Sequence, residues 1–247
     1  MDASTYAVEA IVEETHWWFV VRRRLLARTI AALGLPHDAE VLDVGTSTGT
    51  NLRLLADLGF GHVRGLDSSD EAIRFCAEKG FPVVTRGDAT RLPFADETFD
   101  LVLATDIIEH VDDDSAAVAE MARVLRPGGH AILTVPTFQS IWGLQDDVAH
   151  HKRRYRLGTV LALIERAKLS RRESYYFNYV LFVPIWIARR LIGLLGIRLK
   201  SEAEVNTPWL NTLCRWIFAL DVRTAAVLHP PFGVSALVVA RKPASAP

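Results

Sequence analysis

The sequence predicts an α/β protein built on a doubly wound, mostly parallel seven-stranded sheet. Between residues 40 and 135, five short apolar runs alternate with helical patterns, an order typical of parallel strands joined by crossover helices. The run DLVLAT at 100–105 is apolar on both faces, as expected of a parallel strand covered by helices on each side. No repeat interrupts the alternation, and 247 residues suit one large domain or one domain with an appendage.

The elements of this core are predicted to follow one another through short connections. Ahead of them, residues 7–34 indicate two helical pieces that meet around the aromatic residues 16–19 (HWWF), and Pro36 ends the second piece. Glycines after the helical patterns mark helix ends. We expect strands at 40–44, 62–67, 83–85, 100–105 and 130–135, and helices at 50–59, 69–79 and 115–126.

The alternation stops after Pro136. Residues 137–155 predict a polar and aromatic loop, and two helices are expected in the apolar stretches 176–196 and 209–220, inserted before the last strand. Between the loop and the end of the chain we also expect a helix at 157–169 and strands at 173–177 and 233–240. The predicted parts are an N-terminal helical lid (1–39), an α/β core (40–177 and 231–243) and an inserted helical cap (178–230).

The charges are divided unevenly along the chain. Residues 1–149 contain 12 Lys and Arg against 24 Asp and Glu, whereas residues 150–247 contain 16 against 5. This indicates either an uneven solvated surface or a C-terminal part that faces something anionic. Two cysteines exclude a disulfide scaffold, and the absence of a basic segment followed by an apolar one predicts no signal peptide. We therefore expect a cytoplasmic protein, with membrane association as an alternative.

A glycine-rich loop follows the first predicted strand, in the string VLDVGTSTGTN at 41–51. Gly45 and Gly49 let the backbone turn sharply and approach a ligand, and Asp67 ends the second strand, where a carboxylate accepts hydrogen bonds from ribose. A dinucleotide motif would have glycine where Ser47 stands. Asp43 leads the loop, and a carboxylate suits an ammonium group better than a pyrophosphate.

Four strings of the chain resemble the class I S-adenosylmethionine-dependent methyltransferases over residues 40–136. Besides the glycine loop they are GLDSSDEAI (65–73), GDATRLPFADETFDLVLATDIIEHV (87–111) and RVLRPGGHAILTVP (123–136). The resemblance implies a Rossmann-like methyltransferase fold with S-adenosyl-L-methionine as cofactor. The family usually has glycine where Ser47 stands, which concerns the details of the loop rather than the class.

The resemblance also implies which residues bind the cofactor. Asp43, Gly45, Thr46, Ser47 and Gly49 would line the methionine part, Asp67 and Ser68 the ribose, Asp88 and Ala89 the adenine, and Thr105 or Asp106 would close the site. Trp17, Trp18 and Phe19 would either pack in the core or cover the cofactor, with Arg22 or Arg23 reaching its carboxylate.

Candidate acid–base residues follow the fourth and fifth strands. On a helical turn Asp106, Glu109 and His110 would share a face, an arrangement that would hold a divalent metal or support the cofactor loop. Ubiquinone-type O-methyltransferases, which this region resembles, have a similar string that can hold a metal, but we expect none here. The basic run 150–155 is either a solvated loop or a source of a base for a hydroxyl or phenol. The candidate catalytic residues are His110, His150, His151 and Tyr155.

These observations predict an S-adenosylmethionine-dependent methyltransferase that O-methylates a small-molecule or lipid-linked acceptor by in-line displacement. The alternatives are a non-catalytic cofactor-binding protein and a nucleotide-dependent oxidoreductase on the same fold. No nucleic acid is expected, because no recognised DNA- or RNA-binding module is present. Residues 178–230 predict peripheral membrane contact or a homodimer interface.

Overall fold

The structure is a computed structural model that describes residues 3–81, 83–194 and 207–244. Its strands are β1 (Glu40–Val44), β2 (His62–Asp67), β3 (Val84–Arg86), β4 (Phe99–Thr105), β5 (Leu125–Pro136), β6 (Ser170–Phe177) and β7 (Ser235–Arg241). Its helices are α1 (Ala3–Val12), α2 (Trp17–Ala31), α3 (Thr50–Asp57), α4 (Asp70–Glu78), α5 (Asp114–Val124), the 3-10 turn η1 (Gln139–Ile141), α6 (Leu144–Val148), α7 (Leu157–Arg166), α8 (Phe182–Leu194) and α9 (Pro208–Leu228).

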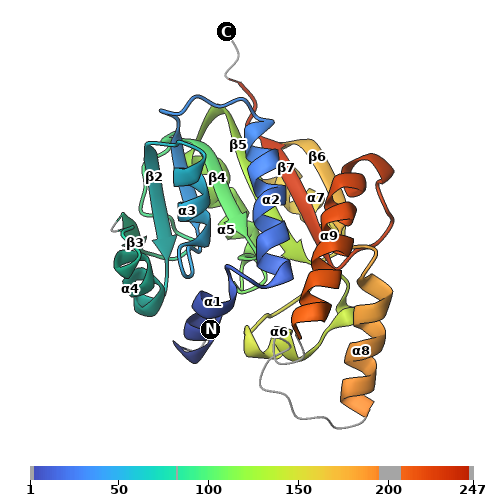
Figure 1. The fold of residues 1–247 in the computed structure, drawn as a ribbon. Helices are drawn as coiled ribbons and strands as arrows, with labels where there is room; N and C mark the ends of the chain where they lie inside the picture. The colour runs from blue at the N-terminus through green and yellow to red at the C-terminus, as the bar shows by residue number, and fades with distance from the viewer. Residues whose placement is uncertain (1–2, 82, 195–206, 245–247) are drawn as a thin grey trace.

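One seven-stranded sheet in the order β3-β2-β1-β4-β5-β7-β6 forms the centre of the molecule (Figure 1). β7 is antiparallel to both of its neighbours, β5 and β6, and the other strand pairs are parallel. The predicted mostly parallel, doubly wound sheet is confirmed. The chain reverses its direction of travel across the sheet between β1 and β4, and ligands of such folds bind beyond the carboxyl ends of the strands at that point.

Apolar side chains are buried on both faces of the sheet. Leu42 and Val102 belong to a cluster completed by α5 and α7 through Met121 and Val160. On the other face, the neighbouring positions of β1 and β4 pack against α2, α3 and α9. Burial of each large apolar side chain contributes about 1.5–3 kcal/mol. The two-sided burial explains why these strands are nearly continuously apolar.

The structure corrects several element boundaries. β5 begins at Leu125 instead of residue 130, because Leu125 pairs with Phe99 ahead of a register shift in β4, so the PGG segment lies within the strand. η1 and α6 occupy part of the segment 137–155 that we expected to be a loop. The helix expected at 157–169 ends at Arg166, shortly before Lys168, whose φ is 59°.

The N-terminal aromatic residues pack against the C-terminal part of the chain. α2 begins at Trp17, and the ring of His16 accepts a hydrogen bond from the Trp18 N–H. The Trp18 ring stacks on Phe218 of α9 and Phe177 of β6, with ring centroids 5.2 and 6.0 Å apart. Of the two alternatives expected for these residues, Trp17 and Trp18 take the packing one and join α2 to α9; a cover over the cofactor stays a prediction.

Two helices are inserted between β6 and β7, as predicted, but they differ in packing. α9 lies beside α2, and its side chains Phe218, Val222 and Ala225 are buried. None of the side chains of α8 is buried, and this helix extends below the sheet in Figure 1. No helix among the described residues has the length and apolar character needed to cross a membrane.

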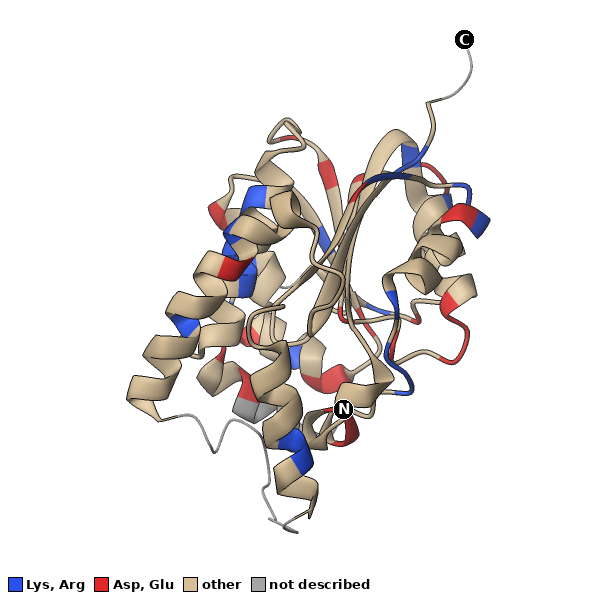
Figure 2. Cartoon of the chain, turned by 90° about the vertical axis from the view of Figure 1, so that its right-hand side faces the viewer, with Lys and Arg blue, Asp and Glu red and all other residues tan. Residues whose placement is uncertain are grey.

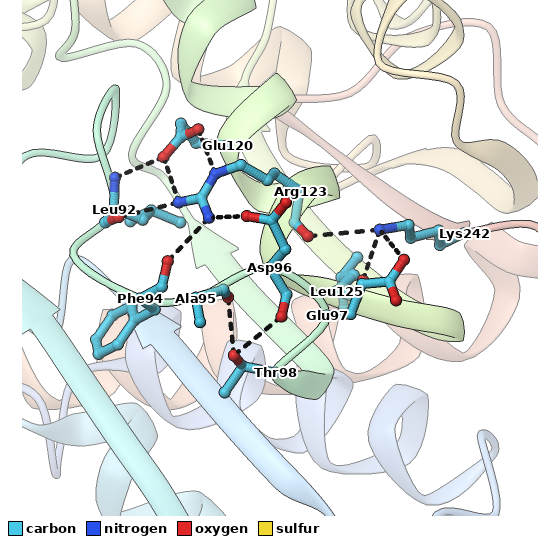
Figure 3. A network of polar contacts seen from close by, with 10 residues as sticks. All are labelled: Leu92, Phe94, Ala95, Asp96, Glu97, Thr98, Glu120, Arg123, Leu125 and Lys242. Carbon is cyan, nitrogen blue, oxygen red and sulfur yellow. Dashed lines mark hydrogen bonds and ion pairs between the residues drawn. The ribbon is translucent and has the colours of Figure 1, made fainter.

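A network of charged groups fixes the edge of the sheet where β4 begins (Figure 3). The Arg123 guanidinium of α5 donates to the backbone oxygens of Leu92 and Phe94 and to the carboxylates of Asp96 and Glu120, at 2.6–3.0 Å. Glu120 in turn accepts the Leu92 N–H at 2.8 Å. The connection between β3 and β4 is thereby tied to α5.

Candidate active site

The glycine loop lies between β1 and α3. Gly45 and Gly49 have φ angles of 77° and 84°, and a Cβ added to Gly45 would lie 1.9 Å from the Ile107 side chain. Substitution of Gly45 would therefore force this loop away from the segment after β4. Ser47 also has positive φ, at 47°, which explains why glycine is the usual residue there in the family it resembles.

Asp43 is the most buried acid of this loop and is only partly hydrogen-bonded. Its Oδ1 accepts from Asn51 Nδ2 at 2.9 Å, and the same amide donates to Thr105 Oγ1 at 2.9 Å. Asp43 Oδ2 is buried and has no partner within the described residues. Burial is the largest cause that raises the pKa of Asp43 to about 7. A buried acceptor left open in this way fits the ammonium group of a bound amino acid.

Asp67 ends β2 and holds the loop by its own carboxylate. It accepts the N–H groups of Ser47 and Ser69, each at 2.9 Å, and burial raises its pKa. Ser68 beside it is exposed. The carboxylate keeps spare lone pairs, since each oxygen accepts more than one hydrogen bond. Binding of ribose at Asp67 and Ser68 stays a prediction.

The predicted adenine-binding residues lie beyond β3. Asp88 is exposed, and its Oδ1 accepts from the N–H and the hydroxyl of Thr90 at 2.7 and 2.8 Å. Ala89 is buried.

Thr46 of the glycine loop is buried, and its side chain points toward Cys76 of α4 and not toward the predicted methionine site. Cys76 Sγ and Thr46 Oγ1 lie 3.6 Å apart.

Helix α1 and the turn that follows it lie against the glycine loop through two glutamates, Glu9 and Glu13, that sequence analysis missed. Glu9 accepts a hydrogen bond from Ser47 Oγ at 2.9 Å. Glu13 is buried, accepts from the hydroxyls of Thr48 and Thr50, and pairs with Lys79 of α4. The spacing of four residues between the glutamates, which places both on one face of a helix, was the available signal.

Arg22 reaches the end of β4. Its Nη2 lies 2.6 Å from Asp106 Oδ2 and 3.4 Å from Thr134 Oγ1. Asp106 has a φ of 58°, and residues 106–113 form turns rather than a helix. The expected face of Asp106, Glu109 and His110 is therefore wrong, because positive φ at Asp106 redirects the chain. Arg23 points elsewhere and donates to the backbone oxygen of Glu13 at 2.7 Å.

Glu109, His110 and His151 form a different group. Their ligand atoms all lie within 4.8 Å of one another, and the two imidazole rings meet edge to face with centroids 4.8 Å apart. Both carboxylate oxygens of Glu109 are buried without a hydrogen-bond partner within the described residues, and burial raises its pKa. Burial lowers the pKa of His110 to about 4. One carboxylate and two imidazoles are donors that suit a divalent transition metal or a proton-transfer site.

Asp146 orients His151. Its Oδ1 lies 2.8 Å from His151 Nδ1 and 2.7 Å from Arg154 Nε, and its Oδ2 accepts the Gly143 N–H at 2.8 Å. Asp146 is completely buried, and its hydrogen bonds and neighbouring charges outweigh desolvation, the largest single influence, to lower its pKa to about 2. The carboxylate therefore fixes a proton on Nδ1 and leaves Nε2 of His151 directed toward Glu109, 4.0 Å away.

The other two candidate catalytic residues lie outside this group. His150 is exposed and has a φ of 56°. Tyr155 is buried, and its hydroxyl donates to Asp114 Oδ2 at 2.8 Å, with the Ile108 oxygen a second acceptor 3.1 Å away. Burial and Asp114 raise the pKa of Tyr155. Tyr155 thus joins the segment after β5 to α5, which is a structural role.

Comparison with known proteins identifies the domain. The sequence profile described as a methyltransferase domain matches residues 42–133. The chain contains a class I S-adenosylmethionine-dependent methyltransferase domain. A demethylmenaquinone methyltransferase of Mycobacterium sp. (strain JLS) is 41% identical over 105 residues, which cover 42% of this chain and 45% of that relative. The chain therefore spans about half the length of this curated relative.

Solved structures agree with the fold of the methyltransferase domain. An S-adenosylmethionine-dependent methyltransferase from Mesorhizobium loti matches with a TM-score of 0.57 and 18% identity, covering 87% of this chain and 96% of that one. The [4+2]-cyclase SpnF matches with a TM-score of 0.59 and 22% identity, covering 89% and 80%. At these identities the likeness shows the fold alone, and the chemistry has to be argued from the site.

The residues of the methyltransferase domain fit the cofactor of this family. The open Oδ2 of Asp43 suits the ammonium of the methionine part, and Gly45 leaves no room for a Cβ where the loop meets Ile107. Asp67 supplies carboxylate oxygens at the end of the neighbouring strand, which suits ribose. The family and fold thus imply S-adenosylmethionine as the cofactor, and its binding across the ends of β1 and β2 stays a prediction.

Proposed function

We propose that the protein transfers a methyl group from S-adenosylmethionine to a hydroxyl oxygen of a ring in a lipid-linked acceptor. The observation that carries the proposal is the Asp146–His151 pair in the segment after β5, which lies beside Glu109 in the segment after β4. Nδ1 of His151 is held by a buried carboxylate, and Nε2 is directed toward that of Glu109, which has no hydrogen-bond partner among the residues that the structure describes. This arrangement has the geometry of a positioned general base.

On the cofactor side, the chain's residues supply position rather than reactivity, because the sulfonium is already an activated methyl donor. Asp43 would hold the ammonium and Asp67 the ribose, and Arg22 and Asp106 would border the methionine part. Alignment of the attacking atom with the breaking bond is the main source of rate in such a displacement.

On the acceptor side, His151 Nε2 would take the proton of the ring hydroxyl. The acceptor oxygen then bonds to the methyl carbon as the carbon–sulfur bond breaks, and the electron pair of that bond stays on sulfur. The products are a methyl ether and S-adenosylhomocysteine, and the proton leaves later from His151. The neutral His110 ring and the carboxyl group of Glu109 would line the same space.

The class of acceptor is inferred from the curated relative, whose name specifies a demethylated menaquinone. A reduced quinone of this kind is a ring with two hydroxyl groups and an attached lipid chain. Loss of a hydroxyl proton also raises the electron density on the adjacent ring carbon, so one base serves O- or C-methylation. We propose O-methylation. Proton NMR of the transferred methyl group distinguishes a methoxy group from a ring methyl, and an O-methylated product can no longer be oxidised to the quinone, whereas a C-methylated one can.

The decisive test compares His151→Ala with His150→Ala, its exposed neighbour. With a short-chain quinol as acceptor, His151→Ala should lower kcat about 10²–10⁴-fold, the usual contribution of a general base. His150→Ala should leave kcat within a few-fold of the parent. Calorimetry should give equal affinities of both variants for S-adenosylhomocysteine. Binding of NAD instead, or binding of the cofactor product with no turnover of any quinol, would contradict the proposal.

A further inference from the structure

The outer surfaces of α8 and α9 hold most of the exposed large hydrophobic side chains in the described part of the chain. Thirteen of the fifteen such side chains lie between residues 180 and 232. In α8 no side chain is fully buried: Ile185 and Arg189 are half-buried against the body of the protein, and most of the other side chains of the helix are exposed. Contiguous apolar surface of this kind on a folded protein marks a place where something binds.

The exposed side chains of α9 form one stripe along the helix. Trp209, Leu213, Trp216 and Leu220 are spaced by three or four residues and are 68%, 47%, 75% and 61% exposed. That spacing places them on one face. The opposite face carries Phe218, which is completely buried against Trp18. The outward stripe is therefore additional to the face that packs on the core.

α8 repeats the pattern at the same end of the molecule. Val183, Ile187, Leu191 and Leu194 are 51%, 45%, 50% and 82% exposed and are also spaced by three or four residues. In Figure 1 α8 extends below the rest of the fold, and α9 begins near the level of α1 and α6 and runs upward beside α2. The two stripes together present tryptophan and aliphatic side chains away from the body of the protein.

The charges on these helices have one sign at the surface. Arg190 and Arg223 are exposed, and the Arg190 guanidinium lies 5.7 Å from the centre of the Trp186 ring. The one acid of the two helices, Asp221, is completely buried and accepts the N–H groups of Asn178 and Val180. In Figure 2, where α8 faces the viewer at the lower edge, its charged positions are blue.

We propose that α8 and the outer face of α9 dock on the surface of an anionic lipid bilayer. The tryptophan and leucine side chains would enter the headgroup region, and the arginines would meet lipid phosphates. A second copy of the chain fits less well. A symmetric dimer places the same patch on both sides of the interface, so the arginines would face arginines with no exposed acid on either helix to pair with them.

The docking surface is connected to the candidate active site through α8. Arg189 of this helix donates to the Ile141 oxygen at 2.5 Å, and its Nη1 lies 3.4 Å from Asp146 Oδ2. A docked protein would thereby hold the His151 side of the site toward the bilayer. Lipid binding itself needs neither cofactor nor acceptor, so its failure would leave the proposed function standing.

Vesicle co-sedimentation of the full chain tests the proposal. We compare vesicles of phosphatidylcholine alone with vesicles that also contain phosphatidylglycerol, at low and high salt. The protein should sediment with the anionic vesicles at low salt, and salt should weaken the association. The double variant Arg190→Gln/Arg223→Gln should lower the partition coefficient about fivefold per arginine. Leu213→Gln/Trp216→Gln should lower it at both salt concentrations.

Exposed residues elsewhere supply matched controls. Val83→Gln and Arg64→Gln change side chains that are 49% and 48% exposed near β2 and β3, and they should sediment like the parent. Equal binding to neutral and anionic vesicles, or no binding, would overturn the proposal. So would a dimer in sedimentation velocity that Leu213→Gln/Trp216→Gln dissociates while the parent ignores vesicles.

Discussion

Two groups of charged side chains at opposite ends of the strands differ in how completely they are hydrogen-bonded. Where β4 begins, Arg123 uses its guanidinium on two backbone oxygens and two carboxylates, and its side chain is 30% exposed (Figure 3). Where β1 and β4 end, Asp43 and Glu109 are completely buried and retain oxygens without partners in the described structure. Burial of an unpaired acceptor costs about 1–3 kcal/mol.

The contrast separates structural charges from charges that are available to a ligand. The Arg123 group contributes to stability and leaves nothing for another molecule to bind. The groups at the carboxyl ends of the strands are destabilising by themselves, which is typical of sites that are completed by a substrate or cofactor. Substitutions at the two ends should therefore affect different properties, and the following predictions test that division.

The largest effect is expected for Asp146→Asn. The amide cannot stabilise the charged imidazole that forms on His151, so kcat should fall about 10²–10⁴-fold, the range of a lost acid–base contribution. A purely structural role would leave the pH profile of kcat unchanged in shape. We therefore measure that profile. Thermal denaturation of the variant shows how far loss of the ion pair with Arg154 lowers stability, so that partial unfolding is not counted as a fall in kcat. An unshifted profile with small loss of kcat would refute the positioning role.

A smaller effect, on binding, is expected for Asp43→Asn. Loss of the charge beside the cofactor's ammonium should weaken binding of S-adenosylhomocysteine by about 1.5–3 kcal/mol. For the parent, a pKa of about 7 means that the carboxylate form disappears as the pH falls. Affinity should thus drop up to about tenfold per pH unit below 7. Calorimetry between pH 5.5 and about 7 measures this, and Asp43→Asn should remove the pH dependence.

The raised pKa of Asp43 also predicts how the stability of the protein depends on pH. The folded-state pKa is raised above the ordinary value of 3.8, so the folded protein retains a proton that the unfolded chain has lost. The free energy of unfolding should therefore decrease as the pH rises from about 4 to about 7. Asp43→Asn should flatten this decrease in urea titrations at several pH values, and an unchanged slope would show that Asp43 is not its source.

At the other end of the strands, Arg123→Gln should change stability and not binding. Removal of its charge-assisted hydrogen bonds should lower the free energy of unfolding by about 1–3 kcal/mol. Affinity for S-adenosylhomocysteine should stay within twofold of the parent, about the uncertainty of a distant substitution. Urea denaturation and calorimetry on one preparation provide both numbers. Loss of binding without loss of stability would contradict the assignment of Arg123 to the structural charges.

The smallest effect is expected from metal removal. The proposed base acts without a metal, so a chelator should leave kcat unchanged. Glu109, His110 and His151 have side chains that could bind a divalent metal. The chelator experiment therefore tests whether they do. Loss of activity in chelator with recovery in a divalent metal would reassign these three side chains as ligands, and His110→Ala should then abolish the recovery.

The fold and the position of the glycine loop could be predicted because their signals are local. Strand β4 is a continuous apolar run, and the glycine loop with Asp43 and Asp67 lies within consecutive elements. The Asp146–His151 pair could be anticipated only in part, because its geometry depends on α6, a helix of five residues with no clear periodicity. His151 and Glu109 lie in loops about forty residues apart in the sequence. Periodicity within single elements does not predict a contact between two such loops.

The position of β7 has a consequence for how the protein is assembled. This strand follows the others in chain order, yet it lies between β5 and β6. Until it arrives, β6 has no neighbour in the sheet, and both edges that will receive β7 expose unpaired backbone groups. Pairings between segments so distant in sequence form slowly. During synthesis, the partly formed sheet would therefore remain open to aggregation until residues 235–241 emerge and close it.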